Sequence, residues 1–282
     1  MTLEFEDPRY TSQDARFVVE CLRAYMAISS AQMRGLAALL LAGPPVQLHP
    51  LMTLIRAQAE ACGSAWWLLG PLLDDANEGG STVNDELIAR NFDALDRSKI
   101  LFLQQLRARL SRLRIDGGEA FDDVANQLVR YEGELVALHG DAGLKWSYRR
   151  DGSPKEIIGI GAAQPPQLTE VVMIAVEYAY GQAHRGEGIN LYKLFSGYAH
   201  GSIEMFFSHG QTAWLSLVRQ ADASGPEVRD FSNLVLRMHY QLLETLVRIM
   251  GRDVGAVDAW GAEWWDTTLG DETKDRTCPE EE

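Results

Sequence analysis

Residues 50–69 read PLMTLIRAQAEACGSAWWLL, and this stretch decides the fold. Its apolar residues recur at steps of three and four, which places them along one broad face of a helix: Leu51, Leu54, Ile55, Ala59, Cys62, Ala65, Trp66 and Leu69. Pro50 is a favoured first helical residue, and Gly70-Pro71 is expected to kink or end the helix. An apolar face of this width must be buried against other helices.

The same helical periodicity extends over most of the remaining chain. It is found at about residues 11–42, 85–114, 119–138, 168–184, 190–207, 212–220 and 231–250. Trp260, Trp264 and Trp265 indicate a short docking helix near the end. Because no alternating β-pattern is sustained, we predict an all-α fold, a helical bundle of seven to nine helices with an irregular loop in the middle.

The predicted loop covers residues 141–166, where a turn at Asp151-Gly152-Ser153-Pro154 and a stop at Pro165-Pro166 interrupt the helices. It connects an N-terminal helical half, residues 1–140, to a C-terminal helical half, residues 167–270, and we expect the halves to form one domain. A loop of this length is typical of a functional lid, a short hairpin or a disordered segment. Residues 271–282 hold six acidic and two basic residues and are predicted to be an acidic disordered tail.

The composition, 46% apolar and 23% charged residues in a chain of 282, is typical of a globular protein. With 26 basic and 40 acidic residues the formal charge is −14, which counts against broad binding of nucleic acids or of anionic membranes. The local exceptions are two groups of cations that either complement a helix dipole or form a confined anion-binding patch: Arg107, Arg109, Arg112 and Arg114, with Arg149, Arg150 and Lys155.

Three widely spaced cysteines, Cys21, Cys62 and Cys278, form no C-x-x-C motif, so we expect a reducing compartment and neither a disulfide framework nor a zinc site. The N-terminus lacks the apolar segment of a secretory signal. The longest apolar stretches are shorter than the roughly 20 residues that a membrane-spanning helix needs. The prediction is a cytoplasmic protein with no membrane association, no metal and no other cofactor.

The strongest candidate site is a series of four polar residues. Tyr192, Ser196, His200 and Glu204 are each four positions apart, so they lie along one face of a helix. This face is either an internal hydrogen-bond network, a solvated surface, or the wall of a binding or catalytic site. In the last case we assign His200 as general acid or base, with Ser196 and Tyr192 beside it as catalytic residues and Glu204 as a ligand-binding residue.

Arg56 and Glu60 form a second candidate, four residues apart at the edge of the apolar stripe. They are either a surface or half-buried ion pair, or a guanidinium that points into the bundle to bind an anion or a carboxylate.

Three short motifs carry a family resemblance. LIRAQAE at residues 54–60, WWLL at residues 66–69 and Tyr192-x3-Ser196-x3-His200-Gly201 resemble uncharacterised actinobacterial helical proteins and are remotely similar to the HEPN-like superfamily. The resemblance implies a helical bundle, dimerisation, and a role in toxin–antitoxin or phage-defence systems. Active members of that superfamily use an Arg-x4–6-His motif to cleave RNA without metal. No histidine of this chain has an arginine four to six positions before it, so the catalytic arginine is not carried over.

Three hypotheses for function follow. The first is a HEPN-like, homodimeric defence or stress protein that engages RNA or a nucleotide, with His200 at the site. The second is a non-catalytic bundle that binds a partner protein or a small ligand, including a small anion. The third is a small-molecule enzyme with a pocket lined by Arg56, Glu60, Tyr192, Ser196 and His200, which predicts that Arg56 and His200 converge around one cavity.

Overall fold

The computed structural model describes residues 10, 12–42, 46–79, 88, 91–114, 118–150, 152, 154–199, 220–221, 226–249 and 253–268. Helix accounts for 83% of the interpretable residues, in eight α-helices, which confirms the prediction of an all-α bundle of seven to nine helices. None of the helices in these ranges has the length and apolar character needed to cross a membrane. The helices are α1 (Ser12–Leu41), α2 (Leu48–Gly79), α4 (Phe92–Leu113), α5 (Glu119–Gly143), α6 (Leu168–Tyr180), α7 (Glu187–Ala199), α10 (Pro226–Ile249) and α11 (Gly255–Thr268).

The chain divides into two compact units, each made of two segments. Unit 1 comprises Met1–Arg23 and Leu68–Gln167, and unit 2 comprises Ala24–Trp67 and Leu168–Glu282. Two of the divisions fall inside α1 and α2, so each of these helices contributes to both units. The third division falls at the end of the predicted connecting loop.

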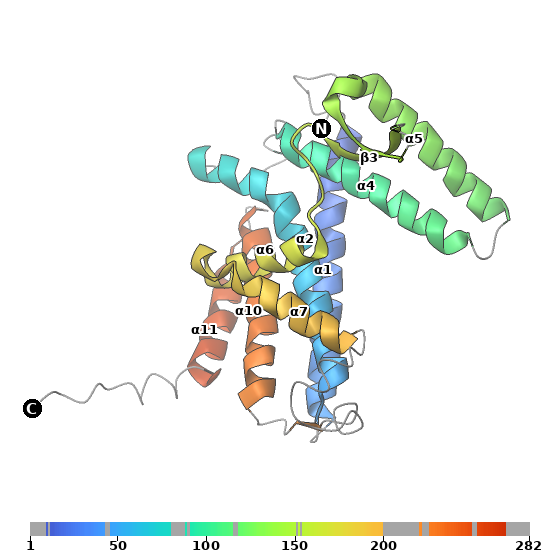
Figure 1. The fold of residues 1–282 in the computed structure, drawn as a ribbon. Helices are drawn as coiled ribbons and strands as arrows, with labels where there is room; N and C mark the ends of the chain where they lie inside the picture. The colour runs from blue at the N-terminus through green and yellow to red at the C-terminus, as the bar shows by residue number, and fades with distance from the viewer. Residues whose placement is uncertain are drawn as a thin grey trace, which may run out of the picture. The chain divides into compact units, whose positions relative to one another are not determined.

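Unit 1 is built on α4 and α5, which pack side by side with a β-hairpin against them (Figure 1). The hairpin joins β2 (Leu144–Tyr148) to β3 (Pro154–Ile160) in antiparallel register, with Leu144 opposite Ile160. Its inward side chains complete a buried apolar cluster with both helices: Ile100, Leu103, Leu135, Leu144, Ile157 and Ile160. The predicted central loop therefore contains a short hairpin, one of the three alternatives open from the sequence.

The strand periodicity of this hairpin is interrupted, which explains why it does not show in the sequence. The register shifts between Lys145 and Trp146 and again between Ser147 and Tyr148. Each irregularity displaces the alternation of inward and outward side chains by one position. The pattern that identifies a strand is thus lost although the hydrogen-bonded pairing is kept.

The join between α2 and α4 differs from the sequence-based prediction at two points. α2 continues through Pro71 to Gly79, so Gly70-Pro71 does not end the helix. Buried Leu68, Leu69 and Leu72 carry the apolar stripe past the proline, and this packing offsets the roughly 3 kcal/mol that an interior proline costs a helix. α4 begins at Phe92, several residues later than expected, because the Asn91 side chain accepts a hydrogen bond from the Ala94 backbone N–H at 2.8 Å and caps the helix.

Unit 2 packs α6 against α7 and α10, and α10 against α11. Most of the apolar stripe of residues 50–69 is fully buried, including Leu51, Ile55 and Trp66. The indole of Trp66 stacks on the ring of Tyr178, with ring centroids 5.0 Å apart. A Cβ on Gly63 would lie 2.0 Å from the Val171 carbonyl oxygen, so α2 and α6 approach more closely than any other residue allows. A short antiparallel pairing of β1 (Val46–Gln47) with β4 (Gln220–Ala221) also belongs to this unit.

Candidate functional site

Three of the residues predicted for a site come together in unit 2. Arg56 Nε donates to Glu60 Oε1 at 2.7 Å, with the side chains 15% and 29% exposed, so the two form a half-buried ion pair. The Arg56 guanidinium lies over the ring of Tyr192, 5.6 Å from its centroid. This contact joins α2 to α7. The ion pair is neutral as a whole, which weakens any attraction of Arg56 for an anion.

The rest of the predicted polar face is described only in part. Ser196 follows Tyr192 by one turn of α7, and its Oγ is buried without a hydrogen-bond partner in the part of the chain that the structure describes. His200 and Glu204 lie outside the described residues. The convergence of His200 with Arg56 therefore stays a prediction.

A buried polar network ties three helices of unit 2 together. Gln58 Nε2 donates to Ser29 Oγ at 2.6 Å, and the same Oγ lies 2.8 Å from His239 Nδ1 and 3.8 Å from Cys62 Sγ. Burial raises the pKa of the Cys62 thiol to about 12 and lowers the pKa of His239. The thiol stays protonated and the imidazole stays neutral near pH 7, so the network stabilises the packing of α1, α2 and α10 and supplies no nucleophile.

The β2–β3 hairpin of unit 1 carries a concentration of cations, and we name it the basic hairpin. Its exposed side chains include Lys145, Arg149, Arg150 and Lys155. Tyr148 stands among them with 63% of its surface exposed. Within the described ranges Arg149 and Arg150 form no ion pair, and Lys155 Nζ lies 3.6 Å from Glu156 Oε1 in a solvent-exposed pair.

Arg107 of α4 contacts this hairpin directly. Arg107 donates to the Ile157 carbonyl oxygen at 2.7 Å and pairs with Glu132 at 2.5 Å, so it fastens the hairpin to the helices. Gly161, just after β3, lies near Asp96 in the N-terminal part of α4, since a Cβ added to this glycine would be 3.5 Å from the Asp96 carboxylate. Ile157, earlier in β3, contacts Arg107 in the C-terminal half of the same helix. β3 thus runs antiparallel to α4, and its Lys155 end points toward the exposed arginines of the last turns, Arg109, Arg112 and Arg114.

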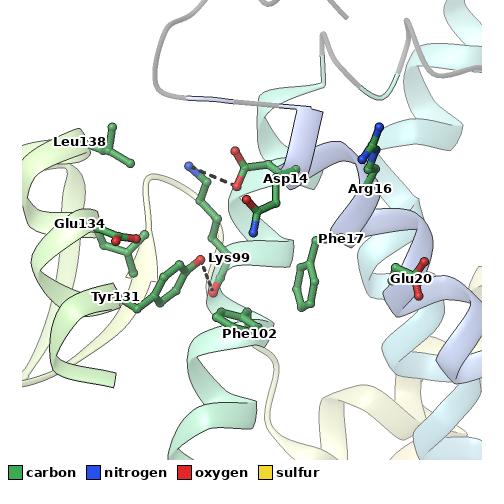
Figure 2. Close-up of a pocket in the computed structure, with 11 residues that line it drawn as sticks. Asp14, Arg16, Phe17, Glu20, Lys99, Phe102, Tyr131, Glu134 and Leu138 are labelled. Carbon is green, nitrogen blue, oxygen red and sulfur yellow. Dashed lines mark hydrogen bonds and ion pairs between the residues drawn. The ribbon is translucent and has the colours of Figure 1, made fainter. Parts of the chain in front are cut away.

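A pocket of about 420 Å³ opens between α1, α4 and α5, all within unit 1 (Figure 2). Three aromatic rings form one wall through edge-to-face contacts. The centroids of Phe17 and Phe102 are 5.1 Å apart, and those of Phe102 and Tyr131 are 4.9 Å apart. Leu135 and Leu138 of α5 extend the apolar lining. We name this site the aromatic pocket.

The polar groups of the aromatic pocket surround a buried amine. Lys99 is 3% exposed, and its Nζ lies 3.8 Å from Asp14 Oδ1 and 4.7 Å from the centroid of the Tyr10 ring. The Tyr131 hydroxyl donates to the Lys99 carbonyl oxygen at 3.5 Å. Burial raises the pKa of Tyr131, and the carboxylates of Asp14, Glu134 and Asp96 raise it further. The phenol is therefore neutral at physiological pH, in a local field dominated by carboxylates.

A smaller neighbouring cavity of about 340 Å³ is lined by polar groups that already interact with one another. The Tyr10 hydroxyl donates to Asp96 Oδ1 at 2.9 Å, and His139 Nε2 lies 4.0 Å from the same oxygen. The Tyr10 ring stacks on Phe92 with an interplanar angle of 6°. In the parts of the chain that the structure describes, no three His, Cys, Asp or Glu side chains are grouped to bind a metal ion.

Sequence reasoning missed the aromatic pocket because its residues come from three helices and form no motif. One signal was present. Lys99 lies four residues after Leu95 and four before Leu103, on the apolar stripe of its helix, where a lysine is expected only if its charge is compensated. Its partner Asp14 is 85 positions away in the sequence, and periodicity within one helix carries no information about such a pair.

Comparison with known proteins identifies no relative of this chain. No protein-family model matches it, and neither a curated protein nor a solved structure is significantly similar to it. The functional argument therefore depends on the geometry of the two units.

Proposed function

We propose that the protein engages single-stranded RNA through the basic hairpin. The observation that carries this proposal is an exposed tyrosine, Tyr148, among four exposed cations on a chain whose net charge is −14. Exposed arginines and lysines next to an exposed aromatic ring are the combination with which proteins hold single strands, because the cations neutralise phosphates and the ring stacks on a base.

The dimensions of the hairpin suit a short single strand. Lys145 lies on β2 and Arg149 directly follows the strand, a separation of four residues that spans at most about 13 Å at about 3.3 Å per extended residue. Stacking of one base on an aromatic side chain contributes about 1–3 kcal/mol. The acidic remainder of the chain repels a polyanion. We therefore expect a small contact that covers a few nucleotides and depends strongly on salt.

The HEPN-like resemblance is consistent with an RNA partner, but it supports no cleavage step, since the Arg-x4–6-His motif is missing. The defence or stress role, the homodimer and a catalytic His200 stay predictions. The proposal is limited to binding, and it does not depend on residues 200–204.

Fluorescence anisotropy with a labelled single-stranded oligoribonucleotide tests the proposal. Replacing Arg149 and Arg150 together by Gln is expected to weaken binding at least tenfold, and Tyr148→Ala at least fivefold, on the scale of one base stack. The matched control replaces two exposed arginines elsewhere in unit 1, Arg23 and Arg130, by Gln. This control should change the affinity less than twofold. Equal losses in both double variants, or no binding by the unsubstituted protein, would refute the proposal.

A further inference from the structure

The aromatic pocket has the size and lining of a small-molecule site. Its volume of about 420 Å³ lies in the range of roughly 300–1,000 Å³ that is usual for ligand pockets, which combine apolar walls with a few polar groups. The rings of Phe17, Phe102 and Tyr131 give it an aromatic wall. All its lining residues belong to unit 1, so its geometry is set by α1, α4 and α5 alone.

The charges around the pocket favour a cation. Lys99 and Asp14 compensate one another, and the Tyr10 ring also lies against the ammonium group. In Figure 2, Arg16 and Glu20 lie on the other side of Phe17, and Glu20 pairs with Arg23 at 3.5 Å, so both are away from Tyr131. On the Tyr131 side of the pocket, the lining carboxylate is that of Glu134. Its ion pair with Arg130 is 3.7 Å long and solvent-exposed, and such pairs are weak.

We propose that the aromatic pocket binds a small organic cation, an amine or quaternary ammonium group on an aromatic or apolar body. The body packs against Phe17 and Phe102, and the cationic group lies between the Tyr131 ring and the carboxylate of Glu134. Aromatic faces attract cations through their quadrupole, and this attraction strengthens where water is excluded. The raised pKa of Tyr131 agrees with this placement, because it reports the negative field of Asp14, Glu134 and Asp96 at the phenol.

An anionic ligand fits the pocket poorly. A carboxylate or phosphate placed against the aromatic wall would face Glu134 and Asp14. The buried cation, Lys99, is already held by Asp14 and by the Tyr10 ring. The preference for a cation also separates this pocket from the basic hairpin, which attracts anions, so one site can fail its test while the other passes.

Three probes of similar shape and different charge test the inference on the full chain: phenethylamine as the cation, 2-phenylethanol as the neutral form and 3-phenylpropionate as the anion. Titration calorimetry is expected to give phenethylamine a Kd of about 1 mM or tighter, which is attainable for a ligand of this size. The alcohol should bind at least fivefold more weakly than the amine. Equal or tighter binding of the anion, or no binding of the amine, would overturn the proposal.

A pair of variants locates the site. Glu134→Gln removes the carboxylate beside Tyr131. It is expected to weaken the binding of phenethylamine at least threefold and to leave the binding of 2-phenylethanol unchanged. Glu119→Gln removes a carboxylate of the same helix away from the pocket and should leave both probes unchanged. Glu134 is 56% exposed, so its replacement does not threaten the fold. If the two variants have the same effect on phenethylamine, the amine does not bind where we propose.

Discussion

Lys99 shows most clearly how one residue departs from the pattern of its helix. It occupies a buried position of α4 in line with Leu95 and Leu103, where its amine lies against Asp14 and the face of Tyr10. The helical periodicity predicts that position 99 is buried. It does not predict the compensating charge, because Asp14 belongs to another helix. The residues that form a site in this protein are joined by contacts of this kind, across helices.

Lys99→Met is expected to destabilise the protein by about 2 kcal/mol, because it removes the ammonium group that faces the partly buried carboxylate of Asp14. Asp14→Asn should have a smaller effect, since Asp14 is 20% exposed. The double variant should lose clearly less stability than the sum of the two single variants. Urea unfolding of all four proteins measures this coupling. Additive losses would show that the ion pair contributes nothing to stability.

At the level of the helices, the packing of α2 against α6 depends on one glycine. The apolar stripe in residues 50–69 predicts which face of α2 is buried, but not that Gly63 lets the helix approach the backbone of α6. Gly63→Ala should destabilise the protein by about 3 kcal/mol, because the new methyl group would meet the Val171 carbonyl oxygen and the helices would have to separate.

Gly133→Ala is the matched control in an exposed part of α5. No atom outside the helix backbone lies within 4 Å of the added Cβ, so the change should stabilise by about 0.5–1 kcal/mol through the higher helix propensity of alanine. If α2 and α6 approach as closely as the structure shows, thermal unfolding should give a lower melting temperature for Gly63→Ala and a higher one for Gly133→Ala. A shift in the same direction would contradict it.

The contact between α1, α2 and α10 predicts a dependence of stability on pH. Burial lowers the pKa of His239 below its ordinary value of 6.5, so the unfolded chain binds a proton more readily than the folded protein does. The contribution of the neutral His239 to the free energy of unfolding is therefore fully present above about pH 6.5. It is lost as the pH falls further, by at most about 1.4 kcal/mol per pH unit.

His239→Gln removes this titration, so the difference in unfolding free energy between the two proteins should shift in favour of the variant between pH 7 and pH 5. Chemical unfolding at a series of pH values measures the difference. A constant difference over this interval would mean that the imidazole titrates equally in the folded and unfolded states.

The elements themselves were largely predictable, and the exceptions have physical causes. The helices α1, α5 and α6 begin within one residue of their predicted starts, because apolar periodicity and the residues that flank the helices mark them. For the β2–β3 hairpin the sequence leaves three alternatives open, because two register shifts break the alternation that would identify its strands. The start of α4 was placed too early, since the capping of the helix by Asn91 was not evident from the periodic pattern.

At the scale of the whole molecule, the distribution of charge is the feature most relevant to function. The net charge of −14 counts against broad nucleic-acid binding, and the basic hairpin contains three of the seven cations that the sequence suggested as a confined anion-binding patch, Arg149, Arg150 and Lys155. Of the predicted site residues, Arg56, Glu60 and Tyr192 are brought together, whereas His200 and Glu204 are outside the described residues. Sequence alone placed the cations in a loop, and only the fold shows them on an ordered hairpin with Tyr148.

The salt dependence of RNA binding tests the central claim most directly. If the four cations of the basic hairpin each neutralise one phosphate, the logarithm of the binding constant should fall with the logarithm of salt concentration with a slope of about −2.8, from about −0.7 per contact. Removing the charges of Arg149 and Arg150 should reduce the slope to about −1.4, while the double control at Arg23 and Arg130 should keep it near −2.8. A slope that is the same in all three proteins would contradict the claim that the basic hairpin holds the RNA.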